Sequence, residues 1–170
     1  MVLPDPRFTL NVNDAEDLNG NQECDGNEIC NGTVIDNLTG LVWMQNVDCF
    51  GALTLSDATV TINALAGKGS QCGVAGGSQT GGWRLPNILE ALSLVDFSQV
   101  FPSPAFTPEN SFTHLITFEE AGGPARYWSS TGYPNRNSAE YVSDGYNVSY
   151  GVGWVERWTA GVPAHAMAVK

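Results

Sequence analysis

An acidic loop near the start of the chain carries carboxylate and amide side chains at alternate positions. Counted from Asp17, they occupy loop positions 1, 3, 5, 7, 9 and 12, filled by Asp17, Asn19, Asn21, Glu23, Asp25 and Glu28. This spacing is close to that of an EF-hand calcium loop, in which alternate residues turn their oxygens toward one ion. We therefore predict a metal site formed by these six residues, with calcium as its cofactor.

The loop also departs from the EF-hand pattern. Gln22 stands at the sixth position, where the motif has the glycine of its sharp turn, and no predicted helix flanks the loop. The alternative is a solvated acidic loop that a disulfide between Cys24 and Cys30 holds in place. Titration of the metal-free protein with calcium distinguishes the two.

A second group of residues suited to binding lies between positions 133 and 159. It combines flat aromatic rings with amide and guanidinium donors, and we predict a ligand-binding surface from Tyr133, Asn135, Asn137, Tyr146, Tyr150, Trp154, Arg157 and Trp158. Such residues give contact area at low entropic cost, and aromatic faces also stack on sugar rings. In the alternative, these are alternating strand residues, half of which belong to the core.

Motifs of catalysis are missing from the sequence. It holds no GxSxG elbow, no HExxH and no phosphate-binding loop, and its two histidines, His114 and His165, lie far apart. We therefore expect a binding protein and not an enzyme.

Charge and hydropathy narrow the range of partners. The formal net charge is -11, with 7 Lys and Arg against 18 Asp and Glu. We expect nucleic acids and anionic membranes to be poor partners, because binding them depends on cationic side chains. No apolar run reaches the length that spans a bilayer. The first nine residues lack the basic and apolar regions of a signal peptide, so we expect the mature part of an exported protein.

Four cysteines, Cys24, Cys30, Cys49 and Cys72, lie in the first half of the chain, and none forms a CxxC pair. This argues against zinc ribbons and thioredoxin-like chemistry. An even number in a Gly- and Asn-rich acidic chain favours two disulfides, which we predict as Cys24 with Cys30 and Cys49 with Cys72. The alternative is four reduced thiols in a cytosolic protein.

The secondary-structure signals predict an α+β domain. Residues 33–46 alternate as a β-hairpin, Ser56 or Asp57 begins a helix that runs to about Ala66, and Asn87 with Glu90 has the spacing of a capping box before a second helix. Residues 97–124 read as a long irregular loop, and short strands separated by turns such as Asp144-Gly145 fill the last third. The first 31 residues form a separate loop segment, followed by one domain over 32–170.

Four segments carry a resemblance to a known family. They are VIDNLTGLVWMQN at 34–46, WRLPNILEALSLVD at 83–96, YWSST at 127–131 and AMAVK at 166–170, and in this order they resemble the Lcl C-terminal family of bacterial domains. The resemblance implies a C-type-lectin-like fold, with two helices packed on short antiparallel sheets and long irregular loops. Many similar sequences also carry a cysteine pair at the places of Cys49 and Cys72.

The motifs make sense as scaffold. We expect Trp43, Trp83 and Trp128 to pack in the core, because each stands in a short strand-like segment. Arg84 is expected to pair with an internal carboxylate, Glu90 or Asp96, in preference to a ligand.

Two functions remain open at this level. Members of the family tend to sit on secreted, lipid-anchored or surface proteins, some of them adhesins. The resemblance therefore implies a secreted or cell-surface recognition module, adhesin-like or lectin-like, that binds a glycan or a protein through its late strands. The alternative is a structural or assembly subunit of an extracellular filament or adhesin complex, in which the same surface meets other chains and the protein self-associates.

Overall fold

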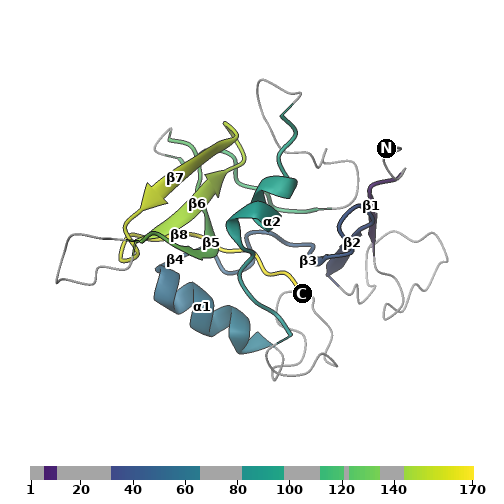
Figure 1. The fold of residues 1–170 in the computed structure, drawn as a ribbon, viewed down its shortest axis with the longest axis horizontal. Coiled ribbons are helices and arrows are strands. Elements are labelled where there is room, and N and C mark those ends of the chain that lie inside the picture. The colour runs from purple at the N-terminus through teal and green to yellow at the C-terminus, as the bar shows by residue number, and fades with distance from the viewer. Residues whose placement is uncertain (1–5, 11–31, 66–81, 98–111, 121–122, 135–143) are drawn as a thin grey trace.

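The computed structural model describes residues 6–10, 32–65, 82–97, 112–120, 123–134 and 144–170 (Figure 1). Within these ranges helices and strands are mixed, so the chain is α+β as predicted. The elements in chain order are β1 (Phe8–Leu10), β2 (Thr33–Asp36), β3 (Val42–Met44), β4 (Ala52–Leu53), α1 (Leu55–Asn63), α2 (Ile88–Ser93), β5 (Tyr127–Gly132), β6 (Gly145–Ser149), β7 (Trp154–Trp158) and β8 (Ala164–His165). They form a three-stranded sheet, β1-β2-β3, and a five-stranded sheet, β4-β8-β5-β6-β7.

The small sheet contains the predicted hairpin, β2 with β3. Buried Asp36 organises its turn: the carboxylate accepts hydrogen bonds from the Leu38 N–H and the Thr39 hydroxyl, while Gly40 takes φ +75. Arg7 donates two hydrogen bonds to the same carboxylate. Burial acts to raise the pKa of Asp36, but the hydrogen bonds from Arg7, Leu38 and Thr39 outweigh it and lower that pKa.

The start of the chain also joins this sheet. β1 pairs antiparallel with β2, from Phe8 opposite Asp36 to Leu10 opposite Val34. The prediction of a loop through residue 31 is therefore wrong for these residues. A strand of three residues is too short to show alternation, and the ion pair that fixes it joins residues 29 positions apart.

The five-stranded sheet is mixed and not purely antiparallel. β5 pairs antiparallel with β6, and β6 with β7, but β8 runs parallel to β5 and antiparallel to β4. The predicted antiparallel character is thus wrong for one pair. After the β6–β7 hairpin the chain crosses back to the edge of β5 that does not pair with β6. There it forms β8, which runs in the same direction as β5.

α1 begins slightly earlier than predicted. Thr54 is its N-cap, because the Thr54 hydroxyl accepts a hydrogen bond from the Asp57 N–H and in turn donates to the Asp57 carboxylate. The helix ends at Asn63, with Ala64 as its C-cap. Ala58 and Ile62 form its buried face.

α2 has the predicted capping box. Asn87 accepts hydrogen bonds from the backbone N–H groups of Leu89 and Glu90, and the Glu90 carboxylate accepts one from the Asn87 N–H. Ala91 and the C-cap residue Leu94 are buried, whereas Leu89 is 74% exposed. The helix is only six residues long, so its contacts with β5 and β6 select the buried side.

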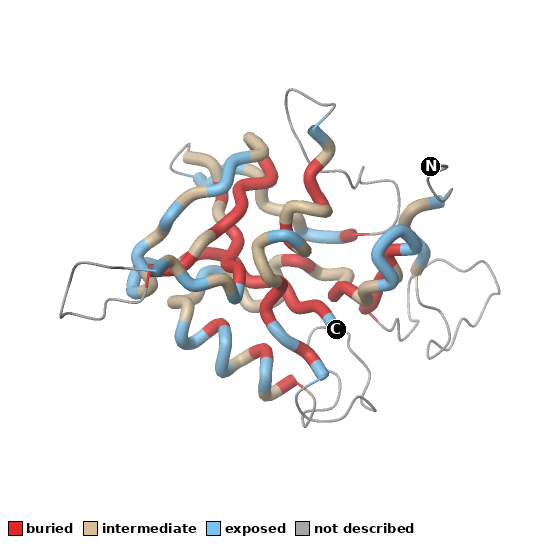
Figure 2. Tube along the Cα trace, viewed as in Figure 1, coloured by how far each residue is buried: buried red, intermediate tan, exposed pale blue. Residues whose placement is uncertain are grey.

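The core consists of two apolar clusters. Trp43 belongs to one, together with Tyr127, Val148 and residues of α2, and Trp83 and Trp128 belong to the other, together with residues of α1. All three tryptophans are fully buried, which confirms their predicted role in packing. Figure 2 shows buried residues following the inner strands and the C-terminal segment.

The C-terminal segment joins the two sheets. Ala164–His165 belongs to the large sheet as β8, and residues 164–169 are all buried. Val169 exchanges two backbone hydrogen bonds with Arg84, and the Val42 N–H donates to the Lys170 carbonyl. The segment therefore ties β3 to the WRLPN stretch.

The expected turn at Asp144-Gly145 is instead the beginning of β6. A Cβ at position 145 would lie 2.9 Å from Leu55 and 3.1 Å from the Trp128 ring. A side chain at position 145 would press on Leu55 and on the Trp128 ring, so packing and not a turn favours glycine here.

Candidate functional site

The six residues predicted to bind calcium lie outside the described residues, and so do Asn135 and Asn137. Within the described ranges, no group of three or more His, Cys, Asp or Glu side chains is arranged to hold a metal. Cys49 is disulfide-bonded. The other three cysteines lie outside the described residues, so their pairing remains a prediction.

Three of the predicted binding residues meet on one side of the β6–β7 hairpin. Tyr146 lies directly opposite Arg157, so both side chains project from the same face. The Arg157 guanidinium stacks over Tyr133 at 4.6 Å, and the Tyr133 and Tyr146 rings meet at 5.5 Å. Arg157 donates through Nε to the buried Asp144 carboxylate at 2.5 Å. We call Tyr133, Asp144, Tyr146 and Arg157 the Tyr–Arg patch.

The predicted tryptophans lie on the opposite face of the hairpin. Side chains alternate along a strand, so Trp154, Glu156 and Trp158 project away from the side that holds Arg157. Trp154 is 57% exposed, whereas Trp158 is half-buried beneath the Arg126 guanidinium, 4.1 Å from its ring. The predicted single surface is therefore divided between two faces of the sheet.

Tyr150 belongs to the core and not to the surface. Its side chain is fully buried among apolar residues, and its hydroxyl donates to the Ala91 carbonyl at 3.2 Å. Burial raises the pKa of Tyr150. Its prediction as a ligand contact is wrong, because its side chain packs against α2 in the core.

On the tryptophan face, buried polar atoms lack hydrogen-bond partners in the described structure. They are both amide atoms of Asn147, the Ser149 hydroxyl and the Trp158 indole N–H. Asn147 and Ser149 share a face of β6, and Asn147 lies directly opposite Glu156. Two further such atoms, in Thr33 and Trp43, lie in the small sheet.

The Arg126–Glu156 ion pair, 2.9 Å long, lies beside these polar atoms. Arg126 precedes β5 and Glu156 is on β7, so the pair passes over β6, which lies between them. Sequence patterns missed Arg126, Glu156 and Ser149 as site residues, because only strand register brings them together.

His165 forms another cluster that sequence spacing did not reveal. Its Nδ1 lies 2.5 Å from the Asp48 carboxylate and its Nε2 lies 2.9 Å from the Glu119 carboxylate. The ring is buried and packs 5.2 Å from Tyr127, whose hydroxyl accepts from the Ile116 N–H. The cluster joins segments 46 and 117 residues from the histidine. Both ring nitrogens are thus engaged in holding segments together.

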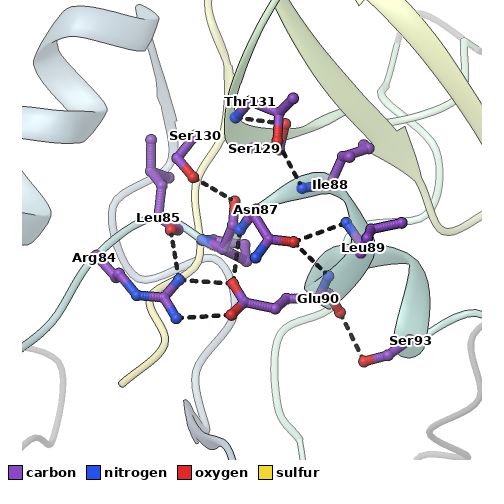
Figure 3. A network of polar contacts seen from close by, with 11 residues as sticks. Arg84, Leu85, Asn87, Ile88, Leu89, Glu90, Ser93, Ser129, Ser130 and Thr131 are labelled. Atoms are coloured by element: carbon purple, nitrogen blue, oxygen red, sulfur yellow. Dashed lines mark hydrogen bonds and ion pairs between the residues drawn. The ribbon is translucent and has the colours of Figure 1, made fainter.

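The WRLPN stretch forms a closed polar network (Figure 3). Arg84 donates to both oxygens of Glu90, at 2.6 and 2.7 Å, which confirms the predicted internal pairing. The Ser130 hydroxyl donates to the Pro86 carbonyl, and the Thr131 hydroxyl accepts from the Ile88 N–H. This network fixes α2 to β5 and is structural.

None of the helices in the described part of the chain has the length and apolar character needed to cross a bilayer. No curated protein and no solved structure matches the chain. The family described as the Lcl C-terminal domain matches residues 32–169, which include the hairpin, the WRLPN stretch and all five strands of the large sheet. The chain therefore belongs to the Lcl C-terminal domain family, as its motifs predict.

Proposed function

We propose that this protein is a non-catalytic recognition module that binds a glycan or protein ligand through its β6–β7 hairpin. The observation that carries the proposal is the Tyr–Arg patch. Arg157 is about half exposed, yet it is held in place by buried Asp144 on one side and by the Tyr133 ring on the other.

Such an arrangement favours binding because the Arg157 side chain has little conformational entropy left to lose when a ligand binds. An isolated arginine side chain loses much rotamer entropy when it is fixed in a complex, whereas Arg157 is already oriented. Tyr133 and Tyr146 add rigid aromatic area with hydroxyl groups at the rim. The patch is therefore preorganised for contact with a polar, partly flat ligand.

We also propose a C-type-lectin-like fold and a secreted or cell-surface location. Two short helices against curled sheets and a disulfide at Cys49 support the fold and fit an oxidising compartment. Calcium binding by the acidic loop at Asp17 to Glu28 belongs to the same proposal, and calorimetric titration of the metal-free protein tests it.

The non-catalytic proposal rests on how the polar side chains are used. Arg84, Arg157 and His165 are each paired with carboxylates that fix the scaffold, as the distances above show. Groups engaged in this way hold segments together and are not positioned toward a reacting atom.

Binding to a glycan array and to a phage-displayed peptide library tests the main proposal. The chain is expected to select ligands from one of them, and the Tyr133→Ala/Tyr146→Ala variant to lose that selection. Val60→Ala, at an exposed position of α1, is the matched control and is expected to bind as the unmodified chain does. Equal binding by the double variant, or no ligand from either source, contradicts the proposal.

A second candidate, an assembly subunit, is favoured by the edge of the large sheet. Among the described residues β7 is the terminal strand of the order and pairs with β6 alone, and Trp154 and Val155 on it are exposed. Open edges can pair with strands of another chain. Light scattering after size exclusion tests this: a concentration-dependent dimer that Val155→Lys abolishes supports assembly, and a strict monomer contradicts it.

A further inference from the structure

We infer that the tryptophan face of the β6–β7 hairpin, opposite the Tyr–Arg patch, is a calcium-independent binding site for a neutral oligosaccharide. The site consists of Asn147 and Ser149 on β6 and of Trp154, Glu156 and Trp158 on β7. It presupposes only that the module binds ligands, and it does not depend on the patch.

The unpartnered polar atoms are the first argument. Asn147 is fully buried and Ser149 nearly so, yet neither amide atom of Asn147 nor the Ser149 hydroxyl has a hydrogen-bond partner in the described structure. Buried polar side chains are nearly always paired, since an unpaired group is destabilising. Asn147 offers a donor and an acceptor side by side, which suits adjacent hydroxyl groups of a sugar, each able to donate and accept.

The aromatic residues give the second argument. Trp154 lies opposite Ser149, and Trp158 projects from the same face four residues farther along β7. Positions this far apart on a strand are separated by about 13 Å. A ligand that contacts both rings must therefore be longer than one sugar ring, and Trp154 already exposes 57% of its surface for stacking.

Charge selects a neutral ligand. Arg126 and Glu156 neutralise each other on this face, and the whole chain carries a net charge of -11. An anionic ligand would meet this overall repulsion, and a cationic one would compete with Arg126. Hydroxyl groups can hydrogen-bond with either charged side chain without needing a countercharge.

The Arg126–Glu156 ion pair controls access. It passes over β6, where Asn147 lies directly opposite Glu156, and the side chains of its two members are 24% and 28% exposed. Ion pairs near the surface are weak. The Arg126 guanidinium also lies over the Trp158 ring, so a movement of Arg126 that breaks the ion pair would uncover this ring and release the Glu156 carboxylate opposite Asn147.

Isothermal titration calorimetry with maltohexaose, cellohexaose and chitohexaose, in the presence of a calcium chelator, tests the inference. At least one is expected to bind, and glucose to bind more weakly. Trp154→Ala is expected to lower the affinity about tenfold, because it removes an exposed stacking platform. Val60→Ala, at an exposed position of α1, is the matched control and is expected to bind the oligosaccharide unchanged.

Asn147→Leu separates a binding role from a structural one. Replacing an unsatisfied amide by an apolar group of similar size is expected to leave the melting temperature unchanged or higher and to abolish oligosaccharide binding. If Asn147→Leu has a lower melting temperature and the unmodified chain binds none of the oligosaccharides, the inference is overturned, because the polar atoms then serve stability. Since that variant could fold poorly, Trp154→Ala at the surface gives an independent result.

The result also separates this inference from the proposed function. If none of the three oligosaccharides binds while an array or peptide ligand depends on Tyr133, the inference is wrong and the recognition function stands. If an oligosaccharide binds but its affinity falls in Tyr133→Ala and not in Trp154→Ala, the sugar site is the Tyr–Arg patch and the inference is again overturned.

Discussion

The WRLPN stretch together with α2, which we call the corner, and the β6–β7 hairpin contain similar residues that are used in opposite ways. Each has tryptophan, an arginine–carboxylate pair and an asparagine. In the corner, Asn87 accepts two backbone hydrogen bonds and Arg84 is paired with both oxygens of Glu90. In the hairpin, the Asn147 amide is buried without a partner in the described structure, and Trp154 is exposed.

This difference separates stability from capacity to bind. In the corner the polar groups are satisfied by partners within the chain, and they fix its conformation. Unpaired polar groups destabilise the fold, and they form their hydrogen bonds only when a ligand binds. We therefore expect substitutions in the corner to reduce stability and substitutions in the hairpin to reduce binding.

Substitution of the tryptophans is expected to change the free energy of unfolding the most. Trp83→Ala is expected to destabilise the fold by about 3–5 kcal/mol, because it empties a fully buried core position. Trp154→Ala is expected to change the free energy of unfolding by less than about 0.5 kcal/mol, because its side chain is largely exposed. Urea unfolding of both variants measures this, and equal losses would remove the distinction between the two regions.

The two asparagines give a sharper comparison with a smaller effect. Asn87→Ala is expected to cost about 1 kcal/mol, because it removes the N-cap of α2. Asn147→Leu is expected not to reduce the stability of the fold, because it replaces an unpaired buried amide by an apolar group. Thermal unfolding followed by circular dichroism compares them directly, and a greater loss in Asn147→Leu would show that the hairpin amide is structural.

The smallest effect is a dependence on pH in the corner. The hydrogen bonds from Arg84 lower the pKa of Glu90 below its ordinary value of 4.5. A carboxylate with a lowered folded-state pKa stabilises the protein above its unfolded-state value, and this contribution is lost as the pH falls through the folded-state pKa. Because Arg84 is partly exposed, we expect this contribution of Glu90 to the free energy of unfolding to be about 1 kcal/mol or less.

Urea unfolding of the unmodified chain and of Glu90→Gln, at several values from pH 6 down to pH 3, measures this contribution. The difference between them is expected to shrink as the solution becomes more acidic. The same substitution in an Arg84→Met background is the control and is expected to show little dependence on pH. A difference that stays constant down to pH 3 would argue against the ion pair as its cause.

Local signals predicted the corner well and the hairpin less well. The capping box at Asn87 and the pairing of Arg84 with Glu90 involve residues three and six positions apart, so short-range spacing carries the information. Tyr150 was predicted at the surface, because composition does not show which side chains a helix such as α2 covers. The His165 cluster was missed because its carboxylates come from distant segments.

The amino-acid sequence by itself determined the α+β class, the family, the buried tryptophans and the capped second helix, because these depend on side-chain size and on neighbours along the chain. Only the tertiary structure decided that β8 enters parallel to β5, that Arg126 reaches Glu156 over β6, and that the predicted binding residues divide between two faces. The physical reason is strand register, since moving a strand by one residue exchanges which side chains share a face.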